Sequence, residues 1–196
     1  MSNNVKLIIF IAVISMLTVF LFLSGCRQKK QKIVIIEKEI PEVETTIDDI
    51  WKIEDESSFV IEMASYIGKI CEYGDNMNAL NENQRTFYIT YTLEGEVNNG
   101  GFSQFFFNSS GDLANEAVSA FEKIGANKTA DICKKAVEIY GESVPLDRDE
   151  REALLIDNDE VDEILNDCDN AFFEYEDDLT ALNYQFIINN KDSFLK

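Results

Sequence analysis

Carboxylates are the most abundant reactive groups in this 196-residue sequence, which has 37 Asp and Glu residues and no histidine. Pairs of carboxylates can act as general acid and base in sugar hydrolysis, but so many pairs are available that none stands out. Without histidine, the usual Ser-His and Cys-His nucleophile systems are absent. No phosphate-binding glycine loop is recognisable. We therefore predict that the chain is not an enzyme.

The densest run of carboxylates lies between Asp147 and Asp178, where 15 acidic residues face two basic ones. A surface of this kind docks a basic protein by charge complementarity, which speeds association and makes it salt-sensitive. The predicted partner-binding residues are Asp157, Asp159, Glu160, Asp162, Glu163, Asp167, Asp169, Glu174, Glu176, Asp177 and Asp178.

Two other interpretations of this run stay open. The carboxylates can form a solvated helix face, with Val161, Ile164, Leu165 and Cys168 turned inward. They can also bind calcium at residues 157–160, although the glycine and glutamate of an EF-hand loop are missing. We predict no metal ion and no cofactor.

The acidic charge belongs to the C-terminal part of the chain. From Pro41 onward there are 11 basic and 35 acidic residues, a net charge of −24. Such a charge argues against direct binding of nucleic acid, which needs cationic side chains. With 45% hydrophobic residues, 14 Phe and 7 Tyr in the whole chain, we expect a packed fold rather than a disordered tail.

The N-terminus contains an apolar run, residues 7–23, followed by Ser24-Gly25-Cys26. Its end resembles a bacterial lipobox. The resemblance implies a signal peptide over residues 1–25, and cleavage before Cys26. It also implies a thiol that carries a lipid with acyl chains such as palmitate. Residues 26–46 would be a tether, residues 47–196 an acidic domain, and the protein a membrane lipoprotein of the cell envelope.

The alternative is an uncleaved membrane anchor. Arg27, Lys29, Lys30 and Lys32 follow the apolar run, and the positive-inside rule would then place the acidic domain in the cytoplasm.

The three other cysteines are Cys71, Cys133 and Cys168, an odd and widely spaced set. Without histidine or a Cys-x-x-Cys pair, they argue against a zinc site. Cys71 and Cys133 fall on apolar helix faces, so we interpret them as small core residues.

Helical periodicity is clear in three segments, each closed by glycine. The first runs from Ser57 to Gly74, the second from residue 114 to Gly125, and the third from 127 to 140, with Asn127 as its cap. Two further helices fit about residues 150–170 and 172–190.

Residues 87–93 conflict with this pattern, because Phe87, Ile89, Tyr91 and Leu93 alternate with polar or smaller residues as in a strand. No second strand is available to satisfy its backbone groups. We therefore favour a helix, with Ile89, Leu93 and Val97 on one stripe.

The following segment, EGEVNNGGFSQFFFNSSG at residues 94–111, is the most distinctive in the chain. It resembles the signature of a bacterial family named after an acidic DNA-mimic protein, and the resemblance extends over about residues 60–196. It implies an all-α fold, a single multi-helix domain, and an acidic surface that imitates DNA phosphates to occupy a DNA-binding protein.

Two roles are open for this signature segment. Structurally, Gly100 and Gly101 permit a sharp turn, and Asn98 and Asn99 can hydrogen-bond nearby backbone. Gln104 and Glu94 can satisfy the turn, and the four phenylalanines can fill the core. Functionally, it can form a polar pocket for a small ligand or cation in an envelope domain. The candidate residues are Glu94, Glu96, Asn98, Asn99, Gly100, Gly101, Phe102 and Gln104.

Overall fold

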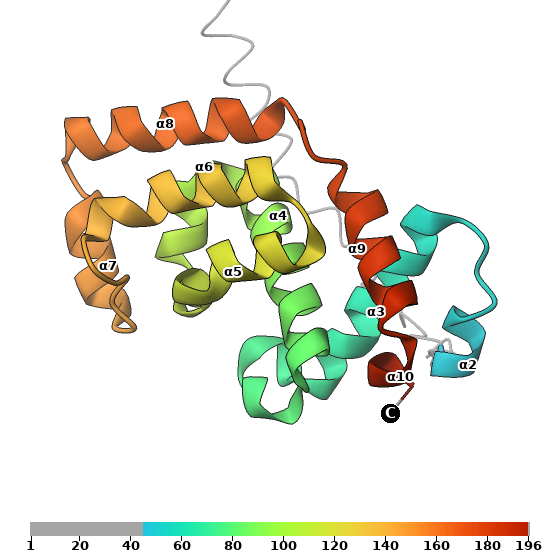
Figure 1. Ribbon diagram of the computed structural model, residues 1–196. Coiled ribbons are helices and arrows are strands. Elements are labelled where there is room, and N and C mark those ends of the chain that lie inside the picture. Colours follow the sequence, from blue (N-terminus) through green and yellow to red (C-terminus); the bar gives the residue numbers. More distant parts are fainter. Residues whose placement is uncertain (1–44, 196) are drawn as a thin grey trace, which may run out of the picture. The chain divides into compact units, whose positions relative to one another are not determined.

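The computed structural model describes residues 45–195 (Figure 1). The chain divides into two units, residues 1–42 and 43–196, of which the second contains the helical domain. The predicted signal peptide, Cys26 and nearly all of the predicted tether lie outside the described residues. Across residues 45–195 all regular structure is helical, which confirms the predicted all-α class.

Nine α-helices and four short 3-10 helices follow one another in the described part of the chain. The α-helices are α2 (Ile47–Ile50), α3 (Glu56–Ile70), α4 (Glu82–Phe107), α5 (Ala114–Ile124), α6 (Asn127–Val137), α7 (Arg148–Leu155), α8 (Asp159–Phe173), α9 (Leu179–Asn189) and α10 (Lys191–Phe194). The 3-10 helices are η1 (Glu72–Gly74), η2 (Met77–Ala79), η3 (Ser109–Leu113) and η4 (Glu138–Tyr140).

Helix α4 is the central element, and helices α3, α5, α7, α8, α9 and α10 all contact it. Between Thr86 and Thr90 it therefore buries residues on every side rather than on one stripe. Phe87, Ile89 and Leu93 are buried as expected, but Tyr88 and Thr90 are buried as well. This explains why residues 87–93 resemble a strand and yet form a helix. With neighbours all round, the alternation of residue types did not correspond to an inner and an outer face.

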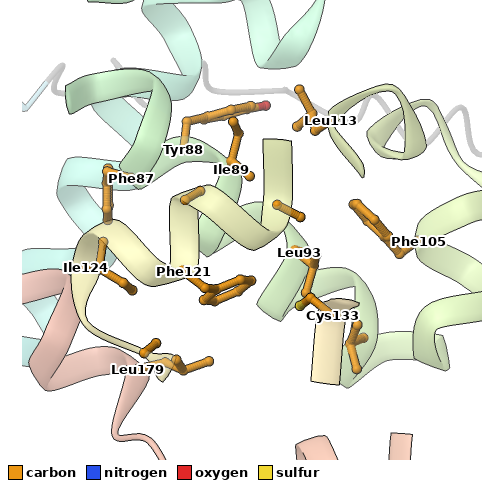
Figure 2. Packing of buried hydrophobic residues seen from close by; sticks show 14 of the residues in the cluster. Phe87, Tyr88, Ile89, Leu93, Phe105, Leu113, Phe121, Ile124, Cys133 and Leu179 are labelled. Carbon is orange, nitrogen blue, oxygen red and sulfur yellow. The ribbon is translucent and has the colours of Figure 1, made fainter. Parts of the chain in front are cut away.

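The core is one continuous cluster of aliphatic and aromatic side chains. Figure 2 shows part of it, where side chains of α4, α5 and α6 converge around Phe121. Cys71, Cys133 and Cys168 are free and buried within it, as the sequence predicted for the first two. Each large apolar side chain that is fully buried contributes about 1.5–3 kcal/mol.

Helix α4 is broken at Gly100 and Gly101, where the backbone leaves helical geometry. Gly101 has φ = 75°, a conformation that side chains with Cβ rarely adopt. The break frees the backbone N–H of Phe102, which donates to Oδ1 of Asp169 on α8 at 2.8 Å. A Cβ on Gly101 would lie 2.9 Å from Cγ of Asp169, inside van der Waals contact. Gly101 is therefore required both by its dihedral angle and by the close approach of α8.

Arg151 on α7 is completely buried. Its guanidinium donates to the carbonyls of Phe106 and Asn108, at the end of α4, and to those of Pro145 and Leu146. It also forms an ion pair with Asp112 at 2.7 Å.

Gly111, the last residue of the signature segment, makes room for this arginine. A Cβ there would lie 2.6 Å from Nε of Arg151 and 2.8 Å from the carbonyl oxygen of Phe106.

Several details of the sequence interpretation were wrong. Helix α3 ends at Ile70, before the glycine at position 74 that was expected to close it. Asn127 is the first residue of α6 and not its cap. The role of cap falls to Asp177, whose Oδ2 accepts from the backbone N–H of Thr129 at 2.8 Å. The segments expected at 150–170 and 172–190 form three helices, because the chain turns at residues 156–158 and 174–178. Phe107 is 43% exposed, outside the core, and the Arg148 guanidinium lies 4.6 Å from its ring.

The glycines of α4 provide a matched pair of substitutions. We expect Gly101→Ala to lower the free energy of unfolding by about 2–4 kcal/mol, through the positive φ and the overlap with Asp169. We expect Gly95→Ala to raise it by up to about 1 kcal/mol, because this site is helical and open. Urea denaturation of both variants measures the difference. A loss of stability in both would contradict the distinction.

The two arginines of α7 provide a second pair. We expect Arg151→Met to cost about 3–5 kcal/mol, because buried carbonyls and Asp112 lose their donors. We expect Arg148→Met to cost about 1 kcal/mol or less, since its ion pair with Glu152 is half exposed. Thermal and urea unfolding report both values. Equal losses would show that Arg151 does not hold the end of α4.

Candidate binding surfaces

The predicted acidic surface is largely exposed. It comprises α8 and the loop that leads to α9, both visible at the top of Figure 1. Nine of the eleven predicted residues are exposed, and the other two, Asp169 and Asp177, are half-buried. The exposed group is Asp157, Asp159, Glu160, Asp162, Glu163, Asp167, Glu174, Glu176 and Asp178.

Three of the eleven residues cap helices. Asp169 accepts from the N–H of Phe102, and Asp177 accepts from the backbone and the hydroxyl of Thr129. Asp178 caps α9 by accepting from the N–H of Ala181 at 3.0 Å. Burial raises the pKa of Asp169, and the hydrogen bond from Phe102 opposes that rise. These three carboxylates already accept hydrogen bonds within the fold. This distinguishes them from the carboxylates that are available to a partner.

The start of α8 carries Asp159, Glu160 and Asp162 in its first turn, and the Asn158 side chain caps it. Carboxylates at a helix N-terminus interact favourably with the helix dipole, typically by about 0.3–1 kcal/mol each. Part of the repulsion between these like charges is therefore offset locally. Glu163 and Asp167 lie further along, where the dipole gives them no such benefit.

None of the ion pairs within residues 45–195 involves an acidic residue of α8. The nearest contact of this kind is the weak pair between Lys128 on α6 and Glu176, at 4.0 Å. The carboxylates of α8 therefore keep their charge toward solvent.

A hollow of about 420 Å³ lies between α6 and α8. Ile132, Ile139, Ile164 and Cys168 form its apolar lining, and Lys135 and Asp167 also border it. Ile164 was expected to point inward, but it is 38% exposed here. The acidic helix thus has an apolar strip beside its charges.

The signature segment is assembled across the break in α4. Glu96 precedes the break, and its carboxylate accepts from Gln104 at 2.8 Å, Asn108 at 2.9 Å and Ser110 at 3.0 Å. All three donors follow the break. Gln104 therefore does not satisfy the turn itself, which was one expectation; Asp169 does that. These three hydrogen bonds fix the orientation of the Glu96 carboxylate. No Lys or Arg side chain of the described residues forms an ion pair with it.

Glu94 and Asn98 meet Tyr175 from the acidic loop. The Tyr175 hydroxyl donates to Glu94 at 3.1 Å, and the Asn98 amide donates to that hydroxyl at 2.5 Å. Burial raises the pKa of Glu94, and Asp178 raises it further by repulsion. A carboxyl with a raised pKa in the folded state stabilises the fold below its unfolded pKa. That contribution is lost as the pH rises through the folded pKa, so the ionised form of Glu94 destabilises the fold.

An open groove of about 640 Å³ runs between α3 and α4. Its walls combine tyrosines, amides and one carboxylate, and its lining residues include Tyr73, Tyr88, Tyr91, Gly95, Glu96, Asn99, Gln104 and Asn108. A second hollow, of about 260 Å³, shares Ile61, Tyr91 and Gly95 with it and adds Glu94 and Asn98.

The structure thus brings together most of the predicted signature residues. Glu94, Glu96, Asn98, Asn99 and Gln104 border the groove, whereas Gly100 lies outside its lining and Phe102 is in the core. The sequence analysis did not assign Tyr73, Tyr88 and Tyr91 to this site, because they lie outside the signature segment. Their aromatic character was the available signal, but aromatic residues equally suggest the hydrophobic core.

Chemistry based on metal ions or thiols finds little support in the described region. In residues 45–195, no group of three or more His, Cys, Asp or Glu residues could hold a metal ion. Burial raises the pKa of the Cys133 and Cys168 thiols, which disfavours the reactive thiolate. None of the helices between residues 45 and 195 is long and apolar enough to cross a lipid bilayer.

Together these features define an acidic, all-α domain with a kinked central helix and exposed carboxylates along one late helix. The model of the DMP19-like protein family matches residues 78–190, which is more than half of the chain. The chain belongs to this family, and the resemblance to an acidic DNA-mimic family is thereby confirmed. No curated protein and no solved structure matches the chain.

Proposed function

We propose that the protein is a non-enzymatic, membrane-anchored acidic binding protein that docks a basic, DNA-binding protein by imitating DNA charge. Membership of the DMP19-like family supports an acidic DNA mimic. The observation that carries the proposal is the set of five α8 carboxylates that are exposed and outside every ion pair of the described chain. Occupying the partner's DNA-binding surface would neutralise the partner.

The charge spacing along α8 fits this role. Fifteen helical residues extend over roughly 22 Å. The five exposed carboxylates of α8, at positions 159, 160, 162, 163 and 167, lie within about 12 Å of that length, an average of about 3 Å along the axis per charge. One strand of DNA carries a phosphate about every 3.4 Å. The apolar strip at Ile164 offers additional contact area beside these charges.

The docking prediction compares two variants of equal charge. In the first, Asp159→Asn, Glu160→Gln, Asp162→Asn and Glu163→Gln neutralise α8. In the second, the exposed residues Asp48, Glu54, Glu56 and Glu122, which lie outside α8, are changed in the same way. The probe is the set of DNA-binding proteins from the same cells, purified on heparin. The readout is release of labelled duplex DNA from them, followed by fluorescence anisotropy.

The unaltered chain should displace DNA, and rising salt should weaken the displacement. The α8 variant should lose about tenfold to a hundredfold in apparent affinity, as expected for four charges worth roughly 0.4–0.7 kcal/mol each. The control variant should stay within about threefold. Equal losses in both variants would reduce the effect to net charge and contradict docking through α8.

Anchoring through Cys26 is the second part of the proposal, and the lipobox-like sequence at residues 23–26 supports it. Mass spectrometry of the protein from the membrane fraction should find a chain that starts at Cys26 and carries acyl mass. Cys26→Ala should abolish both cleavage and lipid. An intact, unlipidated N-terminus would instead favour an anchored protein whose acidic domain faces the cytoplasm.

A further inference from the structure

The two hollows beside α4 adjoin each other, and together they are called the groove below. Ile61 of α3, together with Tyr91 and Gly95 of α4, lines both of them. The lining residues of α3 extend from Ser57 to Gly68, which corresponds to roughly 17 Å along the helix axis. That length accommodates about five residues of extended chain. The groove is open along its length, which suits a peptide better than an enclosed small molecule.

Neither the backbone conformation nor the packing of the described residues requires glycine at position 95. It is helical, and a Cβ there would meet no atom within 4 Å. Gly68 on the opposite helix differs, because a Cβ there would lie 3.1 Å from the Tyr73 ring. Glycine in a helix interior lowers stability relative to alanine. The open space over Gly95 therefore points to a backbone that approaches α4 at this position.

The wall beside Gly68 is held in a strained conformation. Glu72 and Tyr73 have φ values of 53° and 55°, and Gly74 follows with 108°. Residues other than glycine rarely adopt such angles, and strain of this kind concentrates at binding sites. The conformation of residues 72–74 places the Tyr73 ring at the groove, and 68% of Tyr73 is exposed. Ile61, on the floor, is 55% exposed.

The charged residues that line the groove are all of one sign. Its lining contains the carboxylates Glu94 and Glu96 and no lysine or arginine. Asp178 lies close enough to Glu94 to influence its ionisation. Carboxylates beside tyrosine rings attract a guanidinium or ammonium group, by charge and by the cation–π interaction.

We propose that the groove between α3 and α4 binds an extended peptide segment of a partner protein that carries an arginine or lysine side chain. The cationic group lies between Tyr73, Tyr91 and the Glu96 carboxylate. The peptide backbone passes over Gly95 and takes hydrogen bonds from the side-chain amides of Asn99 and Asn108. This site is separate from the α8 carboxylates and does not depend on their function.

The test uses pools of acetylated, amidated pentapeptides with one fixed central residue and mixed flanking residues. The full-length chain is immobilised, and mass spectrometry quantifies the retained peptides. Pools with central Arg or Lys should be retained at least tenfold more than pools with central Gln or Glu. Gly95→Met fills the groove and should lower that retention at least tenfold. Glu96→Gln should lower it also.

Glu122→Gln is the matched control, since it removes the same charge from an exposed site on α5, outside the lining of the groove, and should leave retention within about twofold. Circular dichroism and thermal unfolding establish that Gly95→Met remains folded. Unchanged retention in Gly95→Met, or an equal loss in Glu122→Gln, would overturn the proposal. So would equal binding of arginine amide and the peptides, because the site would then recognise a small cation. Neither result bears on docking through α8.

Discussion

The buried guanidinium of Arg151 is the interaction on which the second half of this domain depends. Every helix leaves carbonyls without partners at its C-terminus, and those at the end of α4 lie in the interior. Arg151 binds two of them, together with the carbonyls of Pro145 and Leu146. It thereby joins α4, the turn before α7, and α7 itself. A buried cation is tolerated because these acceptors and Asp112 replace its hydration.

The break in α4 organises the remaining polar contacts. Because the chain leaves helical geometry at Gly100 and Gly101, residues on its two sides can meet, and Glu96 collects donors from Gln104, Asn108 and Ser110. The same break requires a cap, which Asp169 supplies from α8. One carboxylate of the acidic run is thus committed to the fold, and the position of α8 is fixed by a bond to α4.

Fold and function therefore draw on the same acidic sequence in different ways. Capping positions such as Asp177 and Asp178 hold helix ends, whereas Glu163 and Asp167 are exposed and lie in no ion pair of the described chain. The exposed group presents a row of charge, and the groove by Gly95 presents two carboxylates among tyrosines. Both surfaces carry negative charge, and this is why we propose a basic partner for each, one at a charged face and the other in a shaped groove.

The sequence by itself determined the helical class, the positions of α3 and α5, and the acidic charge. Helical periodicity and terminal glycines are local signals, and composition is independent of the fold. It also located the signature segment that marks the family. Only the tertiary structure decided which carboxylates cap helices, why Arg151 is buried, and that Tyr73 and Tyr91 border the same groove as Glu96. Those facts depend on contacts between residues far apart in the chain. No regular spacing in the sequence indicates which of these residues will meet.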